Sequence, residues 1–381
     1  MFRSEKLKNF DKYAFASISA LKKEVSKRMK VVDMGVGDPD IPTPKEIQGA
    51  LVAALGDLNV NQYPDYQGDY FFREAVARFF LNRYKVKLDP EKNILGLIGS
   101  KEGIFHLPLA ILNPGDVGTY TVPGYPVYRA GIAFAGGKPV EIPLRQENKF
   151  LIAPDEIPEN TKLLFVNYPN NPTTAVASEE FFKKIVSLAH ERNFLIANDA
   201  AYSEIYLEKI SPPISILNIS GAMDVSVEFH SLSKTFCMTG WRIGFVVGNE
   251  EAIASLSALK KYIDSGLFRA IQQAGKNALD NYWEISPSIR KLFARRVEKW
   301  CAALEKIGIS AYNSGATFYV WAEVPKKFND EEFAKFLLER TGIVALPGSA
   351  MGDVSKKFVR FSMTLPDCQL EYAIQQLEKL F

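Results

Sequence analysis

Residues 93–103 read Asn93-Ile-Leu-Gly-Leu-Ile-Gly-Ser-Lys-Glu-Gly103, which predicts a buried strand over Asn93 to Ile98 followed by a tight glycine turn. A helix is expected next, from Glu102 to Leu112. Further apolar runs predict strands at Val117 to Val122, Lys162 to Asn167, Asn193 to Asn198, Val225 to Phe229 and Phe245 to Gly248. Strands that alternate with helices are typical of βαβ units, so the sequence predicts an α/β fold with a mostly parallel, doubly wound sheet.

The length of 381 residues suits a large domain with a smaller one beside it, because single cores rarely grow to this size. We expect an N-terminal arm that forms part of the small domain at residues 1–40, a large domain at 41–286 and a small α/β domain at 287–381. The last segment is expected to begin with a helix after Ser286-Pro287. A strand at Ala316 to Val324, a helix at Asp330 to Arg340, a strand at Phe358 to Ser362 and a final helix are expected to follow.

Two local signals predict where helices begin. Thr43-Pro44-Lys45-Glu46 fits a capping box with proline at the first helical position, and Ser178-Glu179-Glu180 places acids in a first turn. Near the N-terminus, Phe15 to Lys27 predicts a helix whose apolar face could lie on the small domain or on a partner subunit.

The composition excludes several classes of protein. Hydrophobic residues make up 47% and charged residues 24% of the chain, as in ordinary globular proteins. A net charge of +2 supplies no overall field for nucleic acid or an anionic membrane, so neither is an expected partner. The three cysteines are far apart and in no metal-ligand spacing, which predicts reduced thiols, no metal site and a cytoplasmic protein. We expect no secretory signal and no membrane span, since no apolar segment approaches about 18 residues.

One lysine has chemically suggestive surroundings. The segment Ser231-Leu-Ser-Lys-Thr-Phe-Cys-Met-Thr-Gly-Trp-Arg-Ile-Gly244 places Lys234 just after a predicted strand and eight residues before Arg242. Burial near the end of a sheet lowers the pKa of a lysine, which suits an amine that must react with a carbonyl group and later carry a proton. On its own, the motif is equally consistent with a surface lysine.

Polar side chains also follow neighbouring predicted strands. Asp199 closes one strand, where its carboxylate could pair with a protonated pyridine nitrogen of a cofactor. Tyr202 and Asn171 could donate hydrogen bonds to an oxygen on the same ring. Taken singly, these residues are also consistent with a helix cap, a core tyrosine and a turn asparagine. Their joint occurrence favours a cofactor site.

The start of the helix after Gly99 predicts a binding site for a phosphate group. Ser100 and Lys101 open that helix, whose free amides and positive dipole end attract anions. Ser231, Ser233 and Arg242 would complete the site. Tyr125, in Pro123-Gly-Tyr-Pro126, could stack on the face of the ring, although a packed turn aromatic is the alternative.

Taken together, these motifs resemble fold type I pyridoxal-phosphate-dependent aminotransferases along nearly the whole chain. Asn-Pro-Thr, Asp-x-x-Tyr, Ser-x-Ser-Lys and an arginine eight residues later occur in the order of that family. The resemblance implies that Lys234 forms the Schiff base with the cofactor, that Asp199 pairs with its pyridine nitrogen and that Tyr202 and Asn171 contact its 3-oxygen. It places Ser100, Lys101, Ser231, Ser233 and Arg242 at the phosphate and Tyr125 on the ring.

The same resemblance assigns residues at both ends of the chain. Arg360, in Lys357-Phe-Val-Arg-Phe361, matches the arginine that grips the α-carboxylate of the substrate, and Gly37 matches a main-chain contact to that group. Tyr63 matches a tyrosine that reaches the phosphate in the neighbouring subunit. A homodimer with shared active sites is therefore implied.

Within the family, several segments are most similar to LL-diaminopimelate aminotransferases, among them Gly35-Val-Gly-Asp-Pro-Asp40 and Pro123-Gly-Tyr-Pro-Val-Tyr128. This similarity implies ping-pong transfer of an amino group between LL-diaminopimelate and 2-oxoglutarate, in lysine biosynthesis. Thr174 departs from the family pattern, which has glycine after Asn-Pro-Thr. The alternatives are an aminotransferase for aspartate, alanine or aromatic amino acids, a carbon-sulfur lyase and a noncatalytic regulator that binds the cofactor.

Overall fold

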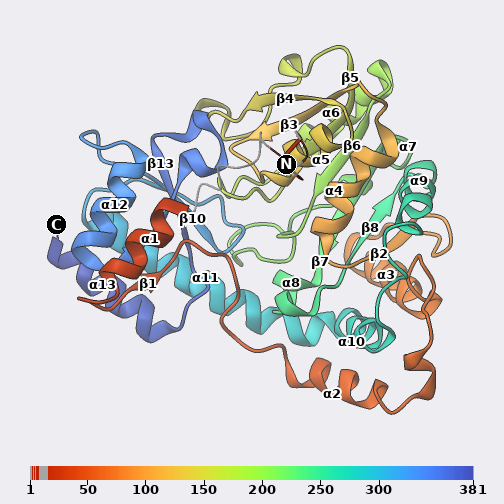
Figure 1. Ribbon diagram of the computed structural model, residues 1–381, viewed down its shortest axis with the longest axis horizontal. Coiled ribbons are helices and arrows are strands. Elements are labelled where there is room, and N and C mark those ends of the chain that lie inside the picture. The colour runs from red at the N-terminus through yellow and green to blue at the C-terminus, as the bar shows by residue number, and fades with distance from the viewer. Residues whose placement is uncertain (1, 3, 5, 8–15, 381) are drawn as a thin grey trace.

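A seven-stranded sheet forms the centre of the larger part of the molecule, as the computed structural model shows over residues 2, 4, 6–7 and 16–380, the part of the chain that the structure describes (Figure 1). Its strand order is β2-β8-β7-β6-β5-β3-β4. The strands are β2 (Ile94–Leu97), β3 (Val117–Val122), β4 (Lys138–Pro143), β5 (Thr161–Val166), β6 (Leu195–Asp199), β7 (Ser226–Ser231) and β8 (Gly244–Gly248). Only β8 runs antiparallel to its neighbours, which confirms an α/β fold with a mostly parallel sheet.

Helices cover both faces of this sheet because alternate strand residues point to opposite sides. Leu163 and Phe165 of β5 belong to one hydrophobic cluster, with α4 (Ser100–Ile111), α5 (Val127–Phe134) and α9 (Glu250–Lys260). Leu164 and Val166 belong to the other, with α3 (Tyr70–Tyr84), α6 (Glu179–Arg192) and α10 (Arg269–Asp280). The outer helix α2 (Lys45–Ala54) packs on α10, and the short helices α7 (Ala222–Val225) and α8 (Leu232–Thr235) flank β7. The sheet is therefore doubly wound.

A second hydrophobic core lies beside the first, at the left of Figure 1. Its antiparallel sheet has the order β12-β13-β10-β9, from β9 (Ala311–Tyr312), β10 (Tyr319–Glu323), β12 (Leu346–Pro347) and β13 (Phe358–Ser362). Helices α12 (Asp330–Thr341) and α13 (Asp367–Leu380) cover it. Near the N-terminus, β1 (Val32–Asp33) pairs with β11 (Ile343–Val344), so the two ends of the chain share this core, as expected.

The long helix α11 (Tyr282–Lys306) connects the two cores. Ile285 and Ile289 pack in the first core, whereas Val297 and Trp300 pack in the second. The expectation that this helix begins after Pro287 is wrong, because Pro287 lies inside it. Burial of Tyr282 and Ile285 favours the helical turn before Pro287 even though the proline removes one main-chain hydrogen bond. The domain boundary at residue 286 stays a proposal.

Other local expectations have mixed outcomes. Ser178 caps α6 through its hydroxyl, which accepts the Phe181 N–H at 3.2 Å, but Thr43 forms no capping box. Its buried hydroxyl donates instead to the main-chain oxygen of Cys237 at 2.8 Å, and Pro44 is the N-cap of α2. Helix α1 (Ala16–Val25) ends against Leu338 of α12, which favours the small domain as its packing partner. Phe15 lies outside the described residues.

The remaining elements are short 3₁₀ helices at Leu58–Asn61, Gln146–Asn148, Pro154–Glu156, Ile216–Asn218, Thr239–Trp241, Gly348–Met351 and Asp353–Ser355. None of the helices in the described part of the chain is long and apolar enough to cross a membrane.

Candidate active site

The candidate residues meet where the strand ends of the large sheet face the second core. Asp199 is the last residue of β6, Asn171 follows β5 and Lys234 lies in α8 directly after β7. From the opposite side, Gly37 follows β1 and Arg360 lies on β13. The carboxyl ends of parallel strands are where open α/β sheets bind ligands.

Lys234 is held by the N-terminal segment. Its Nζ donates a hydrogen bond to the main-chain oxygen of Gly37 at 2.6 Å. Burial lowers the pKa of the Lys234 amine to about 8, with the positive charges of Arg360 and Arg242 acting in the same direction and Asp38 opposing them. About a tenth of the amine is therefore uncharged at pH 7, far more than for an ordinary lysine, which suits a nucleophile.

Asp199 is a buried carboxylate, and each of its two oxygens accepts one hydrogen bond. The Tyr128 hydroxyl donates to Oδ2 at 2.9 Å, and the Ala201 N–H donates to Oδ1 at 3.3 Å. Burial raises the pKa of Asp199 to about 6, although both hydrogen bonds oppose the rise. Such a site stabilises a carboxylate best when a cationic ligand group pairs with it.

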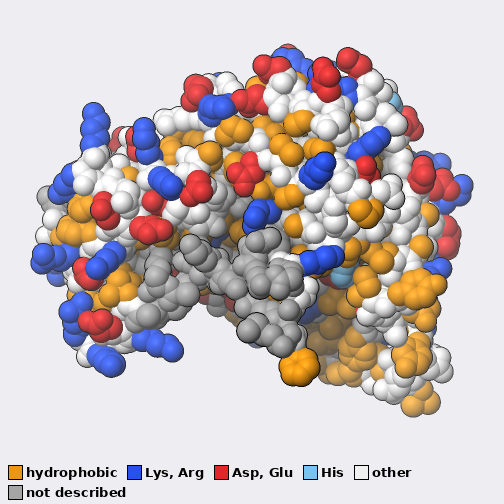
Figure 2. All heavy atoms as spheres, turned by 45° about the horizontal axis from the view of Figure 1, so that its top comes forward, with side chains coloured by type: hydrophobic (Ala, Val, Ile, Leu, Met, Phe, Trp, Pro, Cys, Tyr) orange, Lys and Arg blue, Asp and Glu red, His pale blue; other side chains and the backbone are white. Residues whose placement is uncertain are grey.

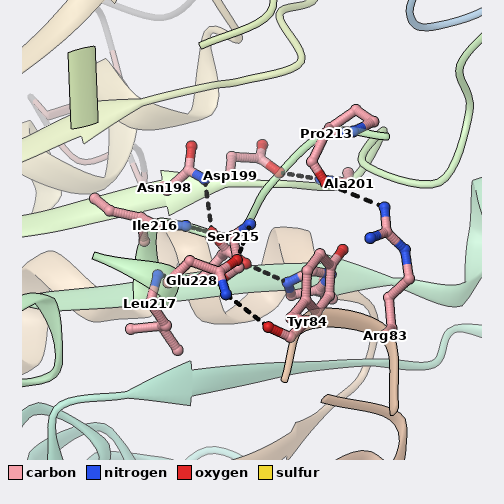
Figure 3. Close-up of polar contacts among 12 residues, drawn as sticks. Arg83, Tyr84, Asn198, Asp199, Ala201, Pro213, Ser215, Ile216, Leu217 and Glu228 are labelled. Carbon is pink, nitrogen blue, oxygen red and sulfur yellow. Dashed lines mark hydrogen bonds and ion pairs between the residues drawn. The ribbon is translucent and has the colours of Figure 1, made fainter. Parts of the chain in front are cut away.

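A second buried acid supports the strand that carries Asp199. Figure 3 shows the adjacent Asn198, whose amide donates to Glu228 on β7 at 3.0 Å. Glu228 also accepts the Ile216 N–H at 2.9 Å and contacts His230 at 2.8 Å. The Asn198–Glu228 bond joins β6 to β7 next to Asp199, and the other two contacts hold the Glu228 carboxylate in place.

Arg360 is buried and makes hydrogen bonds to residues of both parts of the molecule. It donates through Nη1 to Asn171 Oδ1 at 2.7 Å and through Nη2 to the Gly35 oxygen at 2.6 Å. Its Nε has no hydrogen-bond partner among the described residues. Because unpaired buried donors are unfavourable, this guanidinium suits an anionic ligand.

The start of α4 has the geometry of an anion site. Gly99 precedes it with φ of +74°, and a Cβ at this position would lie 2.3 Å from Nη2 of Arg242. A Cβ on Gly244 would lie 2.9 Å from the Ser100 nitrogen, so β8 passes directly beside the first amide of the helix. Gly244 is also the sheet partner of Ser231, whose hydroxyl accepts the Ser233 N–H at 3.2 Å. Ser100, Ser231, Ser233 and Arg242 are thus brought together.

The remaining predicted residues are Tyr125, Lys101 and Tyr63. The Tyr125 ring packs edge-on against Tyr128, 6.0 Å between centroids, which places it next to the partner of Asp199. Lys101 is exposed, and its Nζ lies 5.8 Å from the Tyr125 centroid. Tyr63 is 83% exposed, and its main-chain oxygen accepts a hydrogen bond from Arg269.

Sequence reasoning missed two tyrosines of the site. Tyr128 lies in the first turn of α5, and its N–H donates to the main-chain oxygen of Tyr125, which precedes the helix, at 3.2 Å; the three-residue spacing from Tyr125 was the available signal. Tyr319 shares a hydrogen bond of 2.9 Å between hydroxyl oxygens with Tyr202. It stands in an apolar strand, where an aromatic residue is normally part of the core. Thr174, the departure noted above, adopts φ of +65°, a conformation that favours glycine.

Residues 29–377 match the family model for aminotransferase class I and II. The chain belongs to this family. It is 47% identical to LL-diaminopimelate aminotransferase of Aquifex aeolicus, over 99% of this chain and 98% of the relative. The corresponding enzyme of Halothermothrix orenii is 41% identical with the same coverage. Among solved structures, substrate-bound BacF from Bacillus subtilis superposes with a TM-score of 0.94 at 34% identity and covers 100% of this chain and 98% of its own.

The protein is therefore a pyridoxal-phosphate-dependent transaminase of fold type I. Its residues fit the cofactor: a partly uncharged lysine, a buried carboxylate for a cationic ring nitrogen and an amide-rich helix start beside an arginine for the phosphate. Within the described residues, no group of three or more His, Cys, Asp or Glu side chains could hold a metal ion.

The pKa of Lys234 predicts how covalent cofactor binding depends on pH. Only the uncharged amine attacks an aldehyde, so the attachment rate of the cofactor-free protein should rise about tenfold per pH unit below pH 8 and level off above it. Stopped-flow absorbance would measure this rate. An Asp38→Asn variant should level off at a lower pH, because the Asp38 charge raises the pKa of Lys234. A tenfold rise between about pH 9 and 10 would contradict the prediction.

Burial of Asp199 predicts a gain in stability when its charge is removed. The folded pKa of about 6 exceeds the ordinary value of 3.8, so ionisation destabilises the fold increasingly from about pH 4 to 6 and fully above pH 6. The cofactor-free Asp199→Asn protein should exceed the parent in free energy of unfolding by on the order of 3 kcal/mol at pH 8, and by little at pH 4. Thermal and urea unfolding at both pH values would test this.

The exposed Asp224→Asn variant is the matched control, since its side chain is in water in both states. Equal stability of Asp199→Asn and the parent at pH 8 would show that the buried carboxylate is not destabilising. Transaminase activity should be lost in Asp199→Asn, so stability and activity change in opposite directions.

Proposed function

We propose that this chain is an LL-diaminopimelate:2-oxoglutarate aminotransferase that serves lysine and diaminopimelate biosynthesis. The two relatives named above carry this activity in their names and align with nearly the whole chain. The observation that carries the proposal within the molecule is the position of Lys234, which is hydrogen-bonded to the main-chain oxygen of Gly37, two residues after the Gly35 oxygen that binds Arg360. One amine and one carboxylate-binding guanidinium are thereby arranged for an amino acid.

In the proposed site, the residues have separate tasks. Arg360, Asn171 and the main chain at Gly37 bind the α-carboxylate of the substrate. Asp199 pairs with the ring nitrogen of the cofactor, Tyr202 and Asn171 contact its 3-oxygen and Tyr125 stacks on the ring. Ser100, Lys101, Ser231, Ser233 and Arg242 bind its phosphate.

Lys234 has two successive roles in this proposal. It carries the cofactor until an amino acid takes its place, and its freed amine then moves a proton from the substrate α-carbon to C4′ of the cofactor. Bound pyridoxal phosphate supplies a ring that takes up the electron pair left at the α-carbon, and Asp199 favours this by keeping the ring nitrogen protonated. With the cofactor bound, which would hold the amino group between the two half-reactions, these residues would support release of the first oxo acid before 2-oxoglutarate takes up the amino group.

A panel of amino donors tests the substrate. With 2-oxoglutarate as acceptor, kcat/KM for LL-diaminopimelate should exceed the values for aspartate, alanine and phenylalanine by at least about tenfold. Robust activity on another donor without activity on diaminopimelate would overturn the assignment. Release of ammonia without an acceptor would instead indicate a carbon-sulfur lyase.

The same transamination assay is applied to two lysine variants of the protein. Lys234→Ala should lose multiple turnovers, whereas Lys183→Ala, at an exposed position on α6, should keep the parent rate. Repeated turnover by Lys234→Ala would refute the central role of this residue.

We also propose a homodimer with shared active sites, in the cytoplasm. Exposed hydrophobic side chains occur on and near α2 and the start of α10, namely Val52, Leu55, Leu58, Tyr63, Tyr66, Tyr70, Tyr262 and Phe268. Figure 2 shows many hydrophobic side chains at its lower right, the side where Figure 1 places α2 and α10. An exposed apolar surface of this kind supports an interface between subunits.

Isolated heterodimers of Lys234→Ala and Tyr63→Phe chains test the shared site. If Tyr63 serves the neighbouring subunit, the heterodimer contains one fully intact site and should have about half the parent activity. If Tyr63 serves its own chain, each site of the heterodimer carries one defect. Activity at or below half that of the Tyr63→Phe homodimer would then refute sharing, and a monomer in sedimentation velocity would refute the dimer.

A further inference from the structure

Tyr319 touches three of the residues proposed for the active site, although it has no role in the proposal above. It is the first residue of β10 and is 2% exposed. Its hydroxyl meets that of Tyr202, and its ring lies beneath the guanidinium of Arg360. A Cβ on Gly37 would lie 2.0 Å from its hydroxyl oxygen, so only glycine leaves room for Tyr319 at this point.

The ring of Tyr319 supports the Arg360 side chain. Cζ of Arg360 lies 4.2 Å from the ring centroid, within the range of a cation–π contact. The sheet register produces this contact, because Tyr319 pairs with Ser362 and Trp321 pairs with Arg360 in the antiparallel β10–β13 ladder. Tyr319 and Arg360 are therefore diagonal neighbours on the same face of the sheet.

The hydroxyl of Tyr319 connects β10 of the second sheet with Tyr202, which follows β6 of the large sheet. The two phenol oxygens lie 2.9 Å apart, and the Tyr202 and Tyr319 rings pack edge-on with centroids 5.4 Å apart. Burial raises the pKa of Tyr202, with Tyr319 the second cause, so the Tyr202 phenol stays protonated. Each hydroxyl has one hydrogen to donate, so this bond constrains what Tyr202 can offer to a ligand.

We propose that Tyr319 is a positioning residue that couples carboxylate binding at Arg360 to the hydrogen bond that Tyr202 makes with the cofactor. The ring fixes the plane of the guanidinium, and the hydroxyl orients the Tyr202 phenol. This inference rests on the proposed roles of Arg360 and Tyr202. Substitution can separate the two tasks of Tyr319, because phenylalanine removes the hydroxyl alone, whereas leucine removes both the hydroxyl and the aromatic ring.

The test uses the cofactor-loaded enzyme as Tyr319→Phe, Tyr319→Leu, Tyr202→Phe and the double variant Tyr202→Phe/Tyr319→Phe. Tyr312→Phe is the control, because Tyr312 is a partly buried tyrosine on β9 of the same sheet with ring contacts outside the site. Three quantities are measured: the absorption spectrum of the bound cofactor without substrate, kcat, and KM for the amino donor.

Loss of the hydroxyl should change the cofactor spectrum in the same direction as Tyr202→Phe and reduce kcat about three- to tenfold, with KM within about twofold. Loss of the ring should in addition raise KM about tenfold, since Arg360 loses its support. In the Tyr202→Phe background, Tyr319→Phe should have no further effect on the spectrum or on kcat, because its hydroxyl acts through Tyr202. Tyr312→Phe should match the parent.

Additive effects of Tyr319→Phe and Tyr202→Phe would overturn the proposal, as would an unchanged spectrum in Tyr319→Phe. If Tyr319→Leu fails to fold, the cycle of phenylalanine variants still decides the coupling. The spectra require only bound cofactor, so they also separate two failures. A parent enzyme that transaminates none of the donors contradicts the proposed function, whereas an active parent with additive variants contradicts only the role of Tyr319.

Discussion

The hydrogen bond from Lys234 to the Gly37 oxygen is the contact around which the site is organised. It joins the end of the large sheet to a segment held in the second core by the β1–β11 pairing. The acceptor is a neutral main-chain oxygen, so it holds the amine in place without adding a countercharge of its own. Burial can then lower the pKa of Lys234, with Asp38 the main opposing charge.

The positions of the other groups of the candidate site follow from where the strands end. The parallel strands β5, β6 and β7 place Asn171, Asp199 and Lys234 at one edge, while the antiparallel β8 brings Gly244 against the start of α4. The second sheet adds Arg360 and Tyr319 from its adjacent strands β13 and β10. Lys234 follows a strand of the large sheet and Arg360 lies on the second sheet, so in the proposed site the two parts must be packed together before an amino acid can contact both residues.

The sequence was a good guide wherever a local pattern determines the structure. The strand predicted at Val117 to Val122 and that at Phe358 to Ser362 have the predicted bounds, because apolar runs flanked by turn residues leave few alternatives. The edge strand β4 was missed, since half of its residues are exposed and it contains Pro139 and Pro143. Thr43 was misassigned because its hydroxyl is satisfied by Cys237, almost 200 positions away, which no local signal reveals. Within the candidate site, motif spacing pointed to Lys234 and Asp199 and the family resemblance to Arg360, whereas the contacts of Tyr319 depend on sheet register and remained hidden.

The helix α11 sets a mechanical condition on this arrangement. Its 25 residues form a rod about 37 Å long that is packed in the first core at one end and in the second at the other. A tilt of roughly 5° at one end would move the other by ~3 Å. That displacement exceeds the 2.6 Å length of the hydrogen bond between Lys234 and Gly37. The alignment of the candidate reacting groups therefore depends on the stiffness of α11, a helix that contributes none of these groups.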